Sequence, residues 1–439
     1  MVELRIETDG LGEVSIPIDS QFGAHTWRGV QNFPVKLAGH RLGDHQQMVR
    51  ALVSIKLACA GANRESGFLT EIEHKFIVMA CTEILGWSDY GAAFPVHILQ
   101  GGGGTSANMN ANEVIARLAT SLAGSEGVPG LVIDSIDHVN LNQSTNDVYP
   151  AATRMSISIA ASQLIASVHQ LAASYDTLRE KYGDLPRLAR TCLQDAVGTT
   201  FNELFGVYET ALTRCAEHLE SSASDLQKLG TGGGVVGQPD ATPSGYSAAL
   251  PANLNSVFPD ANISLSLNFA DSAQNADDLL RFASELEILA HNLIKQSKDL
   301  RFLSSGPEGG IGEISLPVLQ AGSSAMPGKV NPVIPEFVIH CSIQTLAAVT
   351  AVRMASDQAE LDLNVWEGVY IYNLLNSVQL LNSAVSAFSS KCIAGLEVAE
   401  ELNYQRSQVS TARLTKYAKE TSYSQALEYA AQEKNKSDV

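Results

Sequence analysis

Apolar side chains recur at intervals of three and four residues over long stretches of the chain that contain no proline. Residues 276–298 show the pattern most clearly, through Ala276, Leu279, Leu280, Phe282, Leu286, Leu289, Leu293 and Ile294. This spacing predicts an amphipathic helix. Residues 152–179 have a similar pattern, although the β-branched residues at their start also fit a strand. Residues 337–398 are apolar on several faces, which is typical of helix buried among other helices.

Strand-like patterns are confined to short segments such as 13–18 and 130–134. Glycine, proline and small polar residues gather in a few places, where regular helix is excluded and the backbone can approach a ligand closely. These places are Gly101–Gly104, Gly230–Gly237 with Pro239 and Pro243 after it, Gly306–Gly312, and 321–335. The sequence therefore predicts a mainly α protein with a few loops that could contact a ligand.

Composition and charge narrow the classes of partner. The 439 residues are 45% apolar, enough for a sizeable core, and 29 Lys and Arg against 47 Asp and Glu give a net charge of −18. Such a chain is poorly suited to nucleic acid or to an anionic membrane surface, because phosphate groups attract positive charge. No apolar run reaches about 18 residues, so no membrane-spanning helix is expected. Charges between Glu3 and Asp9 interrupt the stretch where a secretory signal would lie, so we expect a cytoplasmic protein.

Cysteine and histidine spacing gives no sign of a metal site. The chain has no CxxC, HxH or HxxxH pair. Scattered cysteines of this kind are typical of reduced thiols rather than of a disulfide framework or a zinc site. The six are Cys59, Cys81, Cys192, Cys215, Cys341 and Cys392.

Three clusters of hydroxyl and amide side chains stand out. They are 104–110 (GTSANMN), 142–147 (NQSTND) and 322–332 (GSSAMPGKVNP). In the third, Lys329 and Asn331 can together bind a carboxylate, the first by charge and the second by donating hydrogen bonds. Gly322 and Gly328 allow the backbone movement that a closing lid requires. Together the clusters favour a small anionic ligand, bound without a cofactor or a metal.

In this order and spacing, the three clusters resemble the signature regions of the aspartase/fumarase superfamily. The segment 322–331 matches the family pattern GSSxMPxKxN completely, whereas 104–114 resembles GTSxNMNxNEV and 143–147 resembles QSTND. The similarity extends from about residue 4 to residue 405. It therefore covers nearly the whole chain.

The resemblance implies a three-domain fold with a long central helical bundle, in which four chains form a twenty-helix core. We expect an N-terminal mixed helical domain at 1–140, a central bundle domain at 141–392 and a shortened C-terminal helical domain at 393–439. Helices that are apolar on more than one face need partners on several sides, and a homotetramer supplies them. By the resemblance, each active site would draw its three signature regions from three subunits.

The resemblance also implies a carbon–nitrogen lyase for aspartate or an aspartate-like amino acid. Such an enzyme abstracts a proton next to one carboxylate, passes through an aci-carboxylate and expels ammonia or an amine by anti elimination, which gives fumarate. The carbon acid is weak, so donors must stabilise the developing charge. Ser323 matches the family's catalytic base, and nearby backbone N–H groups and Lys329 are the means available to stabilise its alkoxide.

The other expected site residues are those that match functional positions in the superfamily's signature regions. Thr191 and Lys329 join Ser323 as expected catalytic residues. The expected substrate-binding residues are Thr105, Ser106, Asn108, Ser144, Thr145, Asn146, Cys192, Ser324, Met326 and Asn331. Lys329 and Asn331 would hold the second carboxylate, and Asn146 would lie near the leaving group. Met326 would also pack within its loop.

Two histidines have weaker assignments. His138 resembles a secondary carboxylate site of fumarases, with an ordinary surface histidine as the alternative. His25 is expected to be structural rather than an acid or base.

Departures from the family pattern gather around the expected leaving group. Cys192 replaces the His or Gln of the family's GRTHLQDA, and a thiol is a weaker donor than either. Segments 197–205 and 231–239 also differ from the family's VPMTLGQEF and GTAxGTGLN. A buried packing role is the alternative for Cys192. The resemblance therefore specifies the type of reaction better than the substrate.

Other functions stay open beside an aspartate ammonia-lyase. One is a fumarase-type hydro-lyase or a lyase of a substituted aspartate, and a more remote one is a structural protein that reuses the fold, as crystallins do. Retention of Ser323, Lys329 and Asn331 argues against the structural role, which would not need them. Three details are more similar to aspartases than to class II fumarases: His25, Thr145 and the segment 363–367 (LNVWE).

Overall fold

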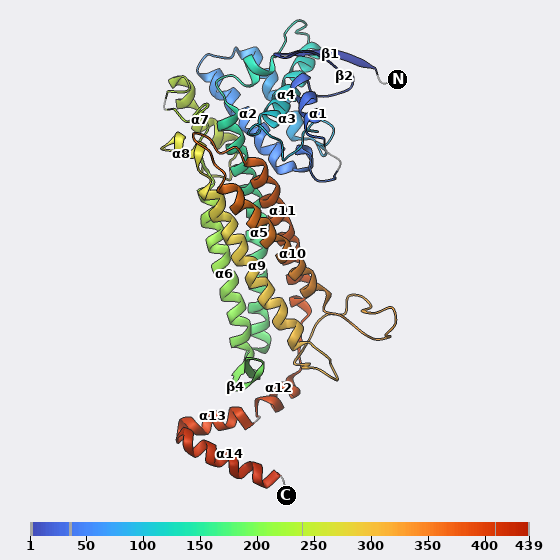
Figure 1. Ribbon diagram of the computed structural model, residues 1–439, viewed down its shortest axis with the longest axis vertical. Coiled ribbons are helices and arrows are strands. Elements are labelled where there is room, and N and C mark those ends of the chain that lie inside the picture. The colour runs from blue at the N-terminus through green and yellow to red at the C-terminus, as the bar shows by residue number, and fades with distance from the viewer. Residues whose placement is uncertain (1–2, 35–36, 239, 409, 438–439) are drawn as a thin grey trace. The chain divides into compact units, whose positions relative to one another are not determined.

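The computed structural model describes residues 3–34, 37–238, 240–408 and 410–437, and it is mainly helical (Figure 1). The fold class predicted from the spacing of apolar residues is therefore confirmed. Contacts between residues divide the chain into two units, each made of three separated segments. The first unit contains 1–163, 218–287 and 344–379, and the second contains 164–217, 288–343 and 380–439.

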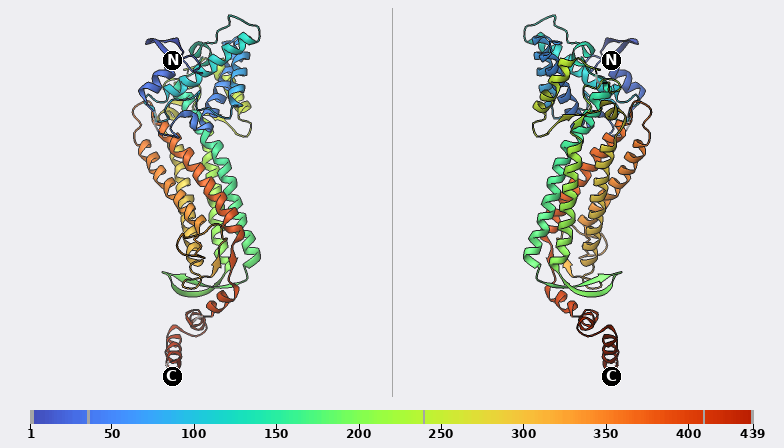
Figure 2. Two further views of the ribbon diagram at one scale, coloured as in Figure 1. Left: turned by 90° about the vertical axis from the view of Figure 1, so that its right-hand side faces the viewer. Right: turned by 90° about the vertical axis from the view of Figure 1, so that its left-hand side faces the viewer.

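Five long helices provide much of the core of both units, and within each unit their segments run side by side (Figures 1 and 2). They are α5 Thr145–Tyr182, α6 Phe201–Asp225, α9 Asp277–Leu303, α10 Val333–Ser356 and α11 Glu367–Lys391. In the first unit, buried Arg154 of α5 pairs with Asp278 of α9 (2.6 Å). In the second, Tyr208 of α6 donates a hydrogen bond to Asp299 of α9 (2.7 Å). The long helical bundle expected from the resemblance is present.

The first unit adds shorter helices to these segments. Its other elements are β1 Leu4–Asp9, β2 Gly12–Pro17, α1 Ala24–Asn32, the 3-10 turn η1 Leu42–Asp44, α2 Gln46–Glu65, α3 Glu71–Leu85, α4 Thr105–Ser125, the π turn η2 Ser135–Val139, β5 Lys228–Leu229, α7 Ser244–Val257, β6 Ser264–Leu265 and α8 Phe269–Gln274. Helix α2 is buried along most of its length and packs against α3 and α7. It therefore forms the centre of this part of the molecule.

The second unit carries small strands and the C-terminal helices. These are β3 Pro186–Thr191, β4 Gln194–Thr200, β7 Ile314–Ser315, the 3-10 turn η3 Ile393–Gly395, β8 Glu397–Val398, α12 Glu400–Ser407, α13 Ser410–Glu420 and α14 Tyr423–Ser437. Strands β3 and β4 form an antiparallel hairpin with a register shift between Leu188 and Arg190. The buried carboxylate of Glu313 accepts hydrogen bonds from Arg190 (3.1 Å to Oε2) and Arg406 (3.2 Å to Oε1), which ties the hairpin to α12.

Several local predictions are decided by the structure. Residues 152–179 lie within helix α5, so the strand alternative for this segment is wrong. Residues 13–18 coincide with β2, but 130–134 form no strand, because the chain there runs as a loop into the turn η2. The apolar stretch 337–398 is divided into α10 and α11 by the non-helical segment 357–366. The β3–β4 hairpin was not predicted, since its strands are rich in polar residues and lack an apolar alternation.

Among the described residues, one helix is long and apolar enough to cross a membrane, judged by length and composition alone. This helix is α10, Val333–Ser356, and 33% of its most apolar window is buried. A core helix of a globular protein satisfies the same criterion. The domain boundaries expected at 140 and 392 stay predictions. The homotetramer also stays a prediction, because the structure describes a single chain.

Candidate active site

The first cluster begins helix α4. Gly102, Gly103 and Gly104 all have positive φ, which side-chain-bearing residues rarely adopt. A Cβ on Gly104 would lie 2.2 Å from the ring of Tyr149, so only glycine fits there. The tight turn places Thr105 at the exposed start of the helix, where its Oγ1 donates to the Gly102 carbonyl (2.9 Å). The hydroxyl is thus near solvent at a helix N-terminus, where partial positive charge favours an anion.

The structure brings the first cluster and the second cluster together within the first unit. The buried amide of Asn108 donates to Thr145 Oγ1 (3.0 Å) and to Asn140 Oδ1 (3.2 Å). Ser144 and Thr145 are half-buried at the start of α5, and Ser106 is buried on α4. Within one chain, two helix N-termini that carry hydroxyl and amide groups therefore lie next to each other.

A buried lysine lies behind these two clusters. Lys56 of α2 has no exposed surface, and its Nζ donates to Asn140 Oδ1 and Gln143 Oε1, each at 2.9 Å. Burial lowers the pKa of Lys56 to about 8. Both acceptors are neutral amides, so the ammonium adds positive charge to the second cluster. Lys56 was not predicted from the sequence, because a single lysine within an apolar helix has no distinguishing spacing.

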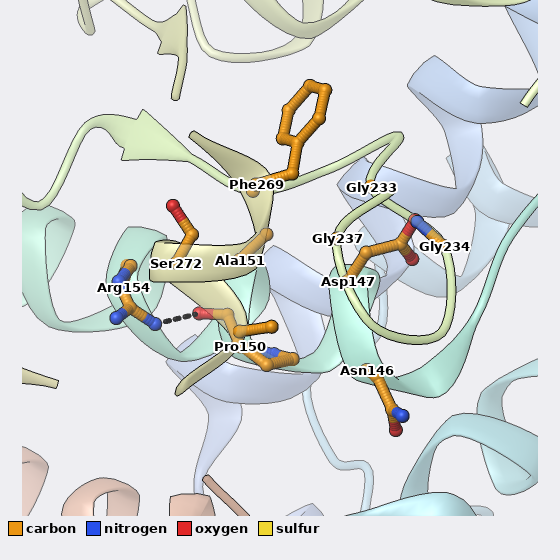
Figure 3. Close-up of a pocket in the computed structure, with 12 residues that line it drawn as sticks. Asn146, Asp147, Pro150, Ala151, Arg154, Gly233, Gly234, Gly237, Phe269 and Ser272 are labelled. Atoms are coloured by element: carbon orange, nitrogen blue, oxygen red, sulfur yellow. Dashed lines mark hydrogen bonds between the residues drawn. The ribbon is translucent and has the colours of Figure 1, made fainter. Parts of the chain in front are cut away.

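The second cluster also holds a glycine turn in place. Asp147 Oδ2 accepts the backbone N–H groups of Gly232 (3.1 Å) and Gly234 (3.0 Å), and Asn146 Nδ2 donates to the Val235 carbonyl (2.9 Å). Figure 3 shows Asp147 directed from the start of α5 toward the glycine turn. Burial raises the pKa of Asp147 to about 6, although its backbone hydrogen bonds oppose the shift. The hollow beside it measures about 10 Å³, room for about one water molecule.

The third cluster lies in the second unit as a loop that folds on itself. The Oγ of Ser323 accepts the backbone N–H groups of Ala325 (3.1 Å) and Met326 (3.0 Å). Two backbone donors on one hydroxyl oxygen stabilise negative charge there, which is what a serine needs to act as a base. Gly322 N–H bonds to the Lys329 carbonyl (2.8 Å), and a Cβ on Gly322 would lie 2.7 Å from that oxygen.

The other residues of this loop differ in exposure and in hydrogen bonding. Lys329, Ser324 and Met326 are exposed, so their side chains face solvent in the single chain. Asn331 is half-buried, and its Nδ2 donates to the Gly322 carbonyl (2.9 Å). Asn331 therefore closes the base of the loop, in addition to the carboxylate binding predicted for it. Met326 is 53% exposed, so packing within the loop accounts for little of its surface.

Thr191 and Cys192 lie at the tip of the β3–β4 hairpin, also in the second unit. Cys192 and Leu193 have φ of 53° and 61°, and both are exposed. The buried packing role considered for Cys192 is therefore wrong for the single chain. The other five cysteines are buried.

Comparisons with known proteins agree with this geometry. The sequence profile of a family described as lyase matches residues 12–346. The chain belongs to this lyase family. It is 34% identical over 401 residues to an aspartate ammonia-lyase of a Bacillus species, which covers 91% of this chain and 84% of that one. It is also 37% identical over 402 residues to a class II fumarate hydratase of Xylella fastidiosa, covering 90% and 82%. The predicted membership of the aspartase/fumarase superfamily is confirmed.

Solved structures of the superfamily share the fold of this lyase. A class II fumarase from Schistosoma mansoni aligns with a TM-score of 0.93 at 28% identity, covering 97% of this chain and 91% of that one. A protein from Brucella melitensis described as fumarate lyase:delta crystallin aligns with a TM-score of 0.88 at 34% identity, covering 98% and 97%. Most of the lyase chain therefore follows the family fold.

Two histidines of the lyase have structural contacts. His138 accepts the Asp134 N–H at Nδ1 (2.8 Å), and its Nε2 lies 3.4 Å from Glu73. Both ring nitrogens of His138 thus have partners within the chain, which favours the alternative of an ordinary histidine over a secondary carboxylate site. The backbone N–H of His25 donates to Glu113 (2.9 Å), whose carboxylate also accepts the Gly23 N–H (2.9 Å). Within the described ranges, no group of three His, Cys, Asp or Glu side chains could hold a metal ion.

Proposed function

We propose that this lyase removes ammonia, or an amine, from aspartate or an aspartate-like amino acid and forms fumarate by anti elimination through an aci-carboxylate. Support comes from aspartate ammonia-lyases that are 34% identical over 91% of the chain. It also comes from the hydroxyl, amide and ammonium groups of the three clusters, which suit a dicarboxylate. No step of this reaction uses a cofactor.

The observation that carries the proposal is the pair of backbone hydrogen bonds to Ser323 Oγ. Elimination requires a base for a weak carbon acid, and an alkoxide is strong enough only if its charge is stabilised. The N–H groups of Ala325 and Met326 supply that stabilisation without a histidine partner. Ser323 would take the proton from the carbon next to one carboxylate, and the electron pair would expel the leaving group from the neighbouring carbon.

The remaining donors would bind the two carboxylates and the developing charge. Thr105, Thr145 and Ser144 lie at helix N-termini, and Lys56 adds buried positive charge behind them. Exposed Lys329 is the cation available to a second carboxylate, and Thr191 and Cys192 are presented by the hairpin tip. These assignments rest on matching positions within the superfamily and on the local geometry of each cluster.

The second candidate is a fumarase-type hydro-lyase, favoured by the relative from Xylella fastidiosa at 37% identity. It shares the base and the carboxylate donors and differs in the leaving group, which is water. Thr145 and Glu367, both typical of aspartases, favour ammonia. Glu367 is buried beside Arg154, with Nη1 of the arginine 3.8 Å from its carboxylate, and burial raises its pKa.

We further propose a cytoplasmic homotetramer in which each active site takes its three clusters from three subunits, and a chain divided into domains at 140 and 392. Exposed apolar side chains on the long helices support the assembly: Ile343 and Met354 of α10 are 51% and 66% exposed. A net charge of −18 agrees with a small-molecule substrate rather than nucleic acid.

The test is fumarate formation, followed by its ultraviolet absorbance, with aspartate, malate and N-methylaspartate supplied separately. The proposal predicts turnover of aspartate or its N-substituted analogue at a kcat/KM above that for malate. Turnover of malate alone would support the second candidate, and turnover of none would exclude both.

A further inference from the structure

Asp147 is a buried acid in the second cluster whose hydrogen bonds all come from the backbone. Its Oδ1 accepts the Ser144 N–H (3.0 Å), which closes the first turn of α5 as a helix cap does. Its Oδ2 accepts the N–H groups of Gly232 and Gly234. The bonds to Oδ2 do nothing for the helix. They hold a turn from a distant part of the sequence against the start of α5.

The same turn orients the neighbouring amide of Asn146. Its Nδ2 donates to the Val235 carbonyl oxygen (2.9 Å). A carbonyl oxygen only accepts, so this bond fixes which end of the amide is the NH₂ group. In the part of the chain that the structure describes, the Oδ1 of Asn146 has no hydrogen-bond partner. It is therefore available as an acceptor.

The backbone of the turn is shaped for these contacts. Gly232 and Gly234 have φ of 95° and 64°, and the N–H groups of both point at one carboxylate oxygen. A Cβ on Gly234 would lie 2.7 Å from the Cβ of Ala241. In Figure 3, Asp147 is directed toward Gly234, whereas the side chain of Asn146 points away from Asp147. The acid, the turn and the amide thus form one connected arrangement.

On the basis of the ammonia-lyase function proposed above, we propose that Asp147 is a positioning residue for the leaving group. Its carboxylate holds the turn 230–237, and the Val235 carbonyl holds Asn146 with Oδ1 as a free acceptor. The substrate's ammonium group departs as ammonia, and its N–H groups are donors throughout, so an acceptor is complementary to them. Because 231–239 departs from the family pattern, the turn is also a place where leaving-group specificity can differ from that of relatives.

The first variant is Asp147→Asn, which keeps one oxygen for the Ser144 N–H but turns an NH₂ group toward Gly232 and Gly234. We expect kcat/KM for aspartate to fall about 10- to 200-fold, the usual effect of losing one specificity contact. The inhibition constant of succinate, which has both carboxylates but no amine, should not change. Steady-state fumarate formation with and without succinate measures both quantities.

A second variant disturbs the arrangement from the other side. Gly234→Ala strains the turn without touching the helix cap, and it should show the same split between aspartate and succinate. If Asp147→Asn does not fold, the Gly234→Ala variant alone tests the proposal. Asp134→Asn is the matched control, because Asp134 also accepts two backbone N–H bonds at the start of a turn but lies outside the clusters. It should leave both quantities unchanged.

Equal losses for aspartate and succinate in both variants, or no loss in either, would overturn the positioning role and leave Asp147 as a helix cap. The wild-type assay separates this from the underlying function. If the wild-type enzyme forms no fumarate from aspartate or an N-substituted aspartate, the ammonia-lyase function fails. If it does and the variants show no split, only the positioning role fails.

Discussion

Ser323 accepts two consecutive backbone N–H groups, and this makes its replacement the sharpest test of the base. Ser323→Ala should lower kcat by about 10²- to 10⁴-fold, the usual effect of removing a general base. The melting temperature should change little, because the loop is also closed by Gly322 and Asn331. The control is Ser305→Ala, since Ser305 Oγ likewise accepts a loop N–H, from Ile311 (3.0 Å), outside the clusters. An alanine variant that keeps more than about a tenth of wild-type kcat would exclude Ser323 as the base.

The buried ammonium of Lys56 predicts a pH dependence of stability. The pKa of Lys56 is about 8 in the folded protein, against an ordinary value of 10.5, so the unfolded chain binds more protons between these pH values. The cost of burying the charge is therefore fully present below pH 8 and disappears as the pH rises toward 10.5. Lys56→Met removes this cost, so its melting temperature minus that of the wild type should fall across pH 8–10.5. A constant difference would mean that the pKa of Lys56 is the same in the folded and the unfolded protein.

At the scale of elements, apolar spacing predicted the helices well, because burial on one face leaves a strong period in 276–298 and 152–179. The β3–β4 hairpin was missed because its strands are rich in polar residues without an apolar alternation, and its tip depends on positive φ at Cys192 and Leu193. The clusters were found by resemblance, which works for side chains that contact substrate. Lys56 and the second carboxylate oxygen of Asp147 support the clusters through contacts between segments far apart in sequence. A local sequence pattern cannot predict such contacts.

Because Cys192 is exposed at the tip of the β3–β4 hairpin, we expect it to influence which leaving group is accepted. Restoring the family residue with Cys192→His should change the ratio of kcat/KM for aspartate to that for N-methylaspartate by about 10- to 200-fold. The melting temperature should not change, because the side chain is exposed and an imidazole overpacks nothing. Leu193→His, at the same tip with a similar φ, is the control and should leave the ratio unchanged. A ratio that stays constant in Cys192→His would remove the hairpin tip from the leaving-group site.

At the scale of the whole molecule, exposed apolar residues on α10 predict that assembly and activity are linked. Ile343→Asp should convert the tetramer to smaller species and abolish turnover, because a charge cannot be buried cheaply in an apolar interface. Ile6→Asp, on the similarly exposed strand β1, is the control and should keep both properties. Sedimentation velocity and fumarate formation on the same samples measure them. A fully active Ile343→Asp monomer would contradict shared active sites.

The central proposal is that Ser323 takes a proton from aspartate while ammonia leaves to give fumarate. The same groups must then also catalyse the addition of ammonia to fumarate. The most direct measurement runs the reaction in reverse: fumarate with ¹⁵N-ammonium in D₂O, followed by NMR. The account predicts ¹⁵N-aspartate with a single deuterium on the carbon next to the nitrogen-bearing carbon, in one diastereomer only, as anti addition requires. Malate as the sole product, or deuterium in both diastereomers, would contradict it.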